Sequence, residues 1–290
     1  MKCLSPLYLE QGEVGCGQCM PCRVNKSRLW TGRLLMEQNC WPMHMNYFVT
    51  LTYDEEHVPT APDGTLTLSK PDGVAFRKAL YHRIGNKLRY FLVGEYGDDF
   101  DRPHFHMMAF GYPEAPDFTT DPTKDPVSAM FKKSWDKGFV TASYATGERA
   151  AYICGYTTKK ITGAKADTHY GSRLPEYSQM SRRPALGDHF VQRLSLYLKS
   201  PQGGRYLVAN GDVPNAFTMR GKQWPIGDRH RRMLRNFLDL PPTRREVYAD
   251  RGELPPLPPV DPAEFSTRSI RYEKTSARRA VFQSRTQRLA

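Results

Sequence analysis

The chain has 290 residues and a formal net charge of +12 at pH 7, so it can form one large domain or two small ones. Its apolar runs are too short to cross a bilayer, and its first residues lack the apolar core of a signal peptide, which argues against a membrane protein and favours the cytoplasm. The positive charge favours nucleic acid as the partner, then an acidic membrane surface, with a merely soluble basic protein as the alternative. Abundant aromatic residues favour a single strand, whose bases stack on rings while its phosphates pair with Arg and Lys.

Three cysteines near the N-terminus follow a C-x2-C-x2-C spacing: Cys16, Cys19 and Cys22. They are too close together for a disulfide scaffold, and a reducing compartment favours metal binding or free thiols. Thiolates on a tight turn can share a tetrahedral Zn²⁺, with a fourth ligand from Cys3 or Cys40. An iron–sulfur cluster is a further alternative, but the bacterial ferredoxin spacing needs a cysteine where this chain has Lys26.

A helix is predicted over residues 24–38, where apolar residues form a stripe that should pack on the domain. The stripe consists of Leu29, Trp30, Leu34 and Met36. Basic residues border it, and they either contact phosphates or are only solvated. These basic residues are Arg23, Lys26, Arg28 and Arg33.

Three strands are predicted next. Residues 47–53 are β-branched and aromatic on both faces, which is typical of a central strand. After a proline-rich loop (54–71) and a helix (71–85), a second strand is predicted over 87–95 and a third over 102–111. A short, turn-rich connection joins the last two, so we expect them to be antiparallel neighbours.

The third strand carries two histidines on one face. Side chains alternate along a strand, so His104 and His106 project together while Phe105 and Met107 face the other side. Two such imidazoles can hold one divalent metal ion, and the alternative is a hydrogen-bonded polar patch. Glu95, at the end of the preceding strand, would complete a set of two histidines and one carboxylate, unless it is an ordinary surface residue.

Downstream of the histidines, the pattern predicts a helix over 126–137, capped by Asp125, and a strand over 138–144. Residues 162–187 are polar and contain Gly and Pro, so we expect a loop. Two further helices are expected, the second strongly basic, then a proline-rich linker and a basic tail that is mobile or a lone helix. Their ranges are 190–200, 220–238, 254–259 and 266–290.

Two tyrosines lie on a predicted helix over 147–160, which Gly155 weakens but does not forbid. Tyr152 and Tyr156 are four residues apart and so share one face, with Lys159 three residues further on. A tyrosine hydroxyl, with a pKa of about 10, is a weak nucleophile, but a nearby lysine and a metal-bound phosphate would help its anion form. These residues predict metal-assisted phosphoryl transfer to tyrosine, and the alternative is that both tyrosines only pack.

The three motifs, Phe48–Tyr53, Arg102–His106 and Tyr152–Lys159, resemble in order and spacing the motifs of HUH rolling-circle replication initiators. The details are most similar to the initiators of small single-stranded DNA bacteriophages, the gokushovirus branch of the microviruses. The cysteine cluster resembles the start of those proteins, and the similarity covers roughly residues 1–165.

The resemblance implies an α+β fold with a central antiparallel sheet, flanking helices and a basic C-terminal extension. We expect a cysteine cluster, a nuclease domain, a basic extension that is separate or part of the same domain, and a linker with a basic tail. The corresponding ranges are 1–23, 24–165, 166–253 and 254–290.

The resemblance also assigns roles. The implied metal ligands, for Mg²⁺ or Mn²⁺, are Glu95, His104 and His106. The implied catalytic residues are Tyr152, Tyr156 and Lys159. Two-tyrosine members often have a lysine where this chain has Gly155, which leaves Lys159 or Lys160 for that role. The candidate DNA contacts are Arg23, Arg28, Arg33, Arg102 and Lys160. The candidate structural zinc ligands are Cys3, Cys16, Cys19 and Cys22.

The implied function is that of a site-specific endonuclease and ligase for single-stranded DNA at a viral origin, in the cytoplasm of a bacterial host. One tyrosine nicks the strand and keeps the 5′ phosphate, the freed 3′ hydroxyl primes a host polymerase, and the second tyrosine permits closure of a circle. The sequence has no G-x-x-x-x-G-K-[ST] run, so a host helicase is expected. The alternatives are a relaxase or transposase of the same fold, and a zinc-containing nucleic-acid-binding protein without catalysis.

Overall fold

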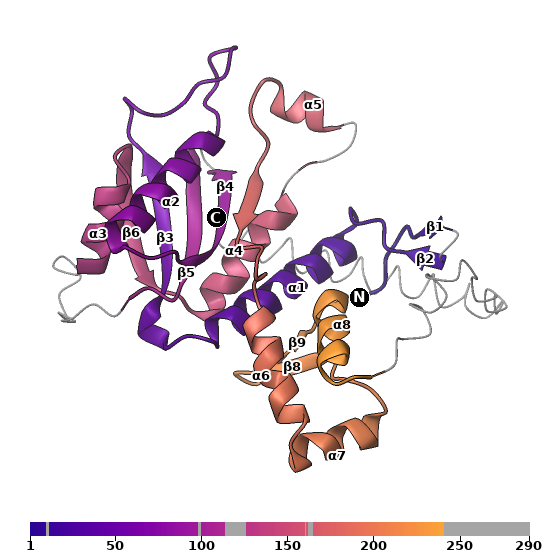
Figure 1. The fold of residues 1–290 in the computed structure, drawn as a ribbon. Helices are drawn as coiled ribbons and strands as arrows, with labels where there is room; N and C mark the ends of the chain where they lie inside the picture. Colours follow the sequence, from indigo (N-terminus) through magenta and orange to yellow (C-terminus); the bar gives the residue numbers. More distant parts are fainter. Residues whose placement is uncertain (10–11, 98–99, 114–125, 160, 162–164, 241–290) are drawn as a thin grey trace. The chain divides into compact units, whose positions relative to one another are not determined.

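The computed structural model describes residues 1–9, 12–97, 100–113, 126–159, 161 and 165–240 (Figure 1). These residues fall into two compact units, residues 1–26 and residues 27–240. The first unit holds a small hairpin, β1 (Leu7–Leu9) and β2 (Gly12–Val14), and the start of helix α1 (Met20–Gln38). The domain boundaries expected from the sequence stay predictions.

A five-stranded antiparallel sheet organises the second unit, which confirms the predicted α+β fold. Its strands are β3 (Asn46–Tyr53), β4 (Arg89–Tyr96), β5 (Pro103–Phe110), β6 (Gly138–Tyr144) and β7 (Tyr177–Met180), in the order β6-β3-β5-β4-β7. Strand β3 is paired on both sides, as its apolar faces required, and β4 and β5 are the predicted antiparallel neighbours.

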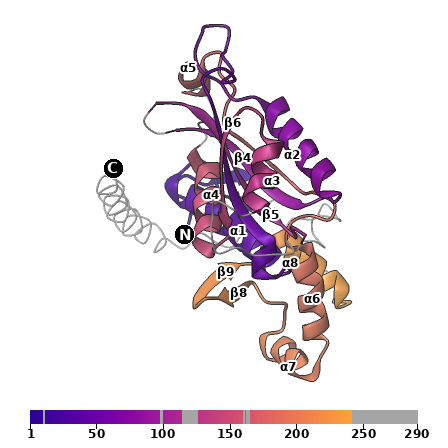
Figure 2. The same ribbon diagram turned by 90° about the vertical axis from the view of Figure 1, so that its left-hand side faces the viewer.

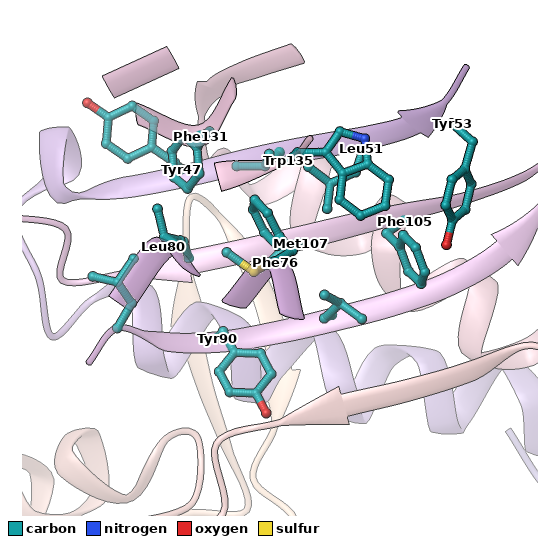
Figure 3. Packing of buried hydrophobic residues seen from close by; sticks show 14 of the residues in the cluster. Tyr47, Leu51, Tyr53, Phe76, Leu80, Tyr90, Phe105, Met107, Phe131 and Trp135 are labelled. Carbon is teal, nitrogen blue, oxygen red and sulfur yellow. The ribbon is translucent and has the colours of Figure 1, made fainter. Parts of the chain in front are cut away.

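One face of the sheet packs on α2 (Lys70–Ile84) and α3 (Pro126–Ser134) (Figures 1 and 2). In this core, shown in Figure 3, Phe105 and Met107 of β5 pack with Phe76 of α2 and Phe131 of α3. These four side chains are almost completely buried, and each such burial contributes roughly 1.5–3 kcal/mol.

Helix α4 (Gly147–Lys159) and the second half of α1 cover the opposite face. There Phe48 of β3 and Met108 of β5 pack with Leu34 of α1 and Ile153 of α4. The predicted helix over 24–38 is therefore present, and it begins earlier, at Met20.

The remaining described elements follow β6 and α4 in the chain. They are α5 (Lys165–Tyr170), α6 (Asp188–Leu198), α7 (Pro201–Asn210), β8 (Ala216–Met219), β9 (Lys222–Pro225) and α8 (Asp228–Phe237), and a short 3-10 helix, η1 (Met43–Met45), precedes β3. Val191 of α6 and Leu234 of α8 are buried in one cluster with Met36 of α1. This packing joins the basic C-terminal helix to the same unit as the sheet.

Two sequence predictions are wrong in this region. Residues 162–187 are not simply a loop, because they contain α5 and the edge strand β7. Residues 220–238 are not one helix, because β9 occupies the start and α8 begins only after Gly227. Short polar elements such as β7 lack the alternation that reveals a longer strand. The Asp125 cap, the linker and the tail lie outside the described residues.

Among the helices of the described ranges, none combines the length and the apolar character that crossing a bilayer requires.

Candidate metal centre and tyrosine pair

Two histidines and a carboxylate meet on the sheet face that α4 covers. The β4–β5 register sets Glu95 opposite His104, and Val93 opposite His106. Oε1 of Glu95 lies 2.7 Å from Nε2 of His104 and 3.0 Å from Nε2 of His106. Phe105, between the two histidines, is buried on the other face, as the alternation predicted.

Neighbouring groups orient both imidazoles. Nδ1 of His104 lies 3.1 Å from the carbonyl oxygen of Arg102, which can only accept, so Nδ1 carries the proton and Nε2 keeps a lone pair. Nδ1 of His106 lies 2.9 Å from the hydroxyl of Thr50, which can accept its proton in the same way. Both contacts leave the Nε2 atoms available toward Glu95, as in metal sites whose second ring nitrogen is hydrogen-bonded.

The residues present fit a divalent cation. One ligand atom from each of Glu95, His104 and His106 lies within 4.8 Å of the others. Oε2 of Glu95 is buried and has no hydrogen-bond partner among the described residues. Burial acts to raise the pKa of Glu95, but hydrogen bonds and charge from the two histidines outweigh it and hold the pKa below its ordinary value. An ionised carboxylate with a spare buried oxygen beside two imidazoles is a suitable donor set for Mg²⁺ or Mn²⁺.

Both tyrosines of α4 lie against this cluster. The ring of Tyr156 stacks on His106 at a centroid distance of 5.2 Å, and Tyr152 meets the same imidazole edge-on at 5.4 Å. The hydroxyl of Tyr156 donates a hydrogen bond to that of Tyr152. Tyr152 is 52% exposed and Tyr156 only 7%. Burial, then the Tyr152 hydroxyl and the charge of Glu95, raise the pKa of Tyr156, so its anion needs a nearby positive charge.

Three residues at the site were not singled out from the sequence. Phe48 stacks on His106 at 5.3 Å, and the guanidinium of Arg149 lies 5.2 Å from the centre of the Phe48 ring. Thr50 orients His106. Alternation along β3 puts Phe48 and Thr50 on one face, and Arg149 lies three residues before Tyr152 on a helix, so spacing alone contained the signal.

The predicted basic residues are distributed differently. At the start of β5, the guanidinium of Arg102 lies 2.6 Å from Glu55 and 2.8 Å from the carbonyl oxygen of Tyr53. Arg28 is exposed and donates to the carbonyl of Gln223.

Arg33 is half-buried with its guanidinium 4.2 Å from the Trp30 ring centre, and burial lowers its pKa. It therefore contributes to packing between α1 and its neighbours. Arg23 belongs to the first unit. The side chain of Lys159 and all of Lys160 lie outside the described residues.

The first unit contains the four-cysteine cluster. The sulfur atoms of Cys3, Cys16, Cys19 and Cys22 all lie within 4.8 Å of one another. Hydrogen bonds from the backbone of Cys19 and Gln18 lower the pKa of Cys16 to about 6. Burial, with its neighbouring thiols, raises the pKa of Cys22 to about 12.

The antiparallel sheet, the carboxylate–histidine cluster and the adjoining tyrosines together define a phage replication-associated protein. The chain belongs to the Replication-associated protein ORF2 family, whose sequence model matches residues 46–161. That range contains β3 to β6 and α4, and hence all five residues of the cluster and the tyrosine pair.

Three relatives are replication-associated proteins of other phages. The chain is 34% identical over 183 residues to ORF2 of Spiroplasma virus 4, covering 60% of this chain and 56% of the relative. It is 27% identical over 225 residues to VP4 of Bdellovibrio phage phiMH2K, covering 73% and 64%. It is 29% identical over 211 residues to ORF4 of Chlamydia phage 1, covering 68% and 49%. The chain thus spans about half to two thirds of the length of these relatives, and no solved structure matches it significantly.

Proposed function

We propose that this protein is an HUH-type replication initiator that cuts single-stranded DNA at a viral origin through a phosphotyrosine intermediate and later rejoins it. The observation that carries this proposal is the contact between His106 and the rings of both Tyr152 and Tyr156, beside a carboxylate–histidine cluster that fits a divalent cation. Membership of a phage replication family supports the same reaction.

Three side chains would hold the cation: Glu95, His104 and His106. When bound, Mg²⁺ or Mn²⁺ would polarise the scissile phosphate and stabilise the negative charge that develops on its oxygens. Thr50 and the carbonyl of Arg102 fix the tautomer and orientation of the two imidazoles. Phe48 supports His106 from the side, and buried surroundings keep these interactions strong.

A tyrosine of α4 supplies the nucleophile. Its hydroxyl loses a proton, its oxygen bonds to phosphorus, and the bond from phosphorus to the 3′ oxygen breaks. The 3′ oxygen leaves as a free hydroxyl, and the 5′ phosphate stays esterified to tyrosine. One phosphodiester bond is exchanged for another of similar energy, so the reverse attack reseals the strand without ATP.

Two tyrosines on one helix face suit alternating cleavage. The second cuts the regenerated origin while the first still holds the original 5′ end, and the released 3′ hydroxyl attacks the first linkage. We propose that Lys159, one turn after Tyr156, assists formation of the phenolate, and that a host helicase and polymerase act around this step.

The test uses overlapping single-stranded oligonucleotides that cover the phage genome, incubated with the full chain and Mn²⁺ or Mg²⁺. We expect a covalent protein–DNA adduct with one oligonucleotide. It should disappear with EDTA, in Tyr152→Phe/Tyr156→Phe and in His104→Ala/His106→Ala. Tight binding without any adduct would instead support a nucleic-acid-binding protein that does not catalyse cleavage.

A further inference from the structure

The four-cysteine cluster of the first unit takes no part in the proposed cleavage. Cys3 comes from the N-terminal segment, Cys16 and Cys19 from the turn before α1, and Cys22 from the first turn of that helix. All four thiols are free. Separate pieces of the chain thus converge on one point through their sulfur atoms.

The spacing of the sulfurs fits one tetrahedral ion. A Zn–S bond of about 2.3 Å sets neighbouring sulfurs about 3.8 Å apart in a tetrahedron. Sγ of Cys3 lies 3.7 Å from Sγ of Cys19, and all four sulfurs lie within 4.8 Å of one another. A multi-iron cluster places several iron and sulfide atoms between its cysteines and so needs wider spacing.

Backbone amides already point at the sulfurs. The amide of Cys16 donates to Sγ of Cys3 at 3.2 Å, that of Cys19 to Sγ of Cys16 at 3.3 Å, and that of Leu4 to Sγ of Cys19 at 3.5 Å. Neutral thiols are weak acceptors, whereas metal-bound thiolates carry the negative charge that such donors stabilise. The N-terminal end of α1 adds a favourable dipole.

Cys40, the other candidate for the fourth ligand, is engaged elsewhere. It is buried, and its Sγ donates to the carbonyl oxygen of Met36 at 3.3 Å. The set of ligands is therefore complete without it.

The first unit also lacks another source of stability. None of residues 1–26 belongs to a hydrophobic core cluster of the described chain. The apolar side chains of β1, Leu7 and Leu9, are 52% and 53% exposed. The N-terminal amine donates to Oδ1 of Asn25 at 2.9 Å, and Asn25 donates back to the carbonyl of Met1 at 2.6 Å. Such a small unit needs a cross-link or a metal to stay folded.

We propose that Cys3, Cys16, Cys19 and Cys22 bind one structural Zn²⁺, and that this ion holds residues 1–26 in their folded arrangement against the start of α1. Four thiolates leave no open coordination position, so the ion takes no part in chemistry. This inference is independent of the proposed cleavage activity.

Metal content tests it directly. The full chain carrying His104→Ala/His106→Ala removes the other candidate metal site, so any retained metal reports on the cysteines. We expect one zinc per chain by elemental analysis after dialysis against EDTA. Cobalt substitution should give strong thiolate-to-cobalt charge transfer and the visible bands of tetrahedral cobalt.

Cysteine variants in the same background identify the ligands. Cys3→Ser and Cys19→Ser should lose zinc on dialysis, whereas the matched control Cys40→Ser should keep it. Stripping zinc with a thiol reagent and a chelator should make residues 1–26 sensitive to protease while residues 27–240 stay resistant. A chain that is purified without metal and gives no tetrahedral cobalt spectrum would overturn the proposal. So would an iron-containing chain, or zinc lost from Cys40→Ser but kept in Cys3→Ser.

Discussion

Tyr152 and Tyr156 share a helix face and an imidazole neighbour, yet their surroundings differ. The exposed hydroxyl of Tyr152 can be reached by a strand from solvent, whereas Tyr156 is buried and its pKa is raised. Two chemically identical groups therefore differ in how readily they attack.

We predict that the first adduct forms on Tyr152. In a single-turnover reaction, fragmentation mass spectrometry of peptide 150–159 should locate the nucleotide there. Tyr152→Phe should slow the first cleavage more than Tyr156→Phe, and either variant should abolish circle closure, which needs both. Nucleotide found first on Tyr156 would show that burial does not control the order of attack.

Glu95→Gln tests the carboxylate without changing its size. Losing the charge should weaken Mn²⁺ binding by at least roughly 10- to 100-fold, measured by calorimetry, with cleavage falling in parallel. Glu148→Gln, at a surface position with an 81% exposed side chain, is the matched control and should bind Mn²⁺ normally. Equal losses in the two variants would mean that general charge, not ligation, governs Mn²⁺ binding.

At the scale of elements, long periodic segments were predictable and short ones were not. Strands β3, β4 and β5 and helices α2 and α4 carry many apolar residues at the expected spacing. Strands β7 and β9 have four residues each and mixed polarity, so no period could emerge.

The candidate site was predictable only within local sequence. Alternation put His104 and His106 on one face, and the short β4–β5 connection brought Glu95 opposite them. No local pattern gives the approach of α4 to β5, or the convergence of Cys3 on Cys19, because those contacts join distant segments through packing. Phe48 was missed for the same reason, since its role depends on lying beside His106.

Helices α6 and α8 enclose a buried histidine whose titration should affect stability. His230 has Arg33 of α1, Arg229 of α8 and Asp188 of α6 around it, with Nε2 3.2 Å from Oδ1 of Asp188. Burial, with the charge of Arg33, lowers its pKa from 6.5 to about 4, although Asp188 acts in the opposite direction.

Between these two pKa values, the unfolded chain binds a proton that the folded chain rejects. Stability is therefore full above the unfolded pKa and falls as the pH drops from 6.5 toward 4. Between pH 7 and pH 5 we expect a loss of about 2 kcal/mol in the free energy of unfolding, measured with urea. His230→Gln should flatten this dependence, and the exposed control His82→Gln should not. An unchanged slope in His230→Gln would place the pH sensitivity elsewhere.

For the whole molecule, the net charge of +12 is concentrated partly at the C-terminal end. The final 25 residues carry Arg268, Arg271, Lys274, Arg278, Arg279, Arg285 and Arg288, and they lie outside the described residues.

We predict that deleting residues 266–290 weakens affinity for single-stranded DNA and flattens its salt dependence, because fewer counterions are released. Single-turnover cleavage at saturating enzyme should survive. Fluorescence anisotropy over a salt series checks the first effect, and a full-length chain with these basic residues changed to Gln should reproduce it. Loss of cleavage at saturation would make the tail part of the site.

The late arrival of β7 in the chain has a practical consequence. It pairs with the segment of β4 from Phe91 to Gly94, whose side chains are among the most buried in the sheet. A fragment that stops at residue 161, where the family match ends, would leave this apolar stretch with unsatisfied amide and carbonyl groups along an open rim. Such a fragment should self-associate and precipitate, so biochemical work on the nuclease needs the polypeptide to continue through Met180 and onward to Leu240.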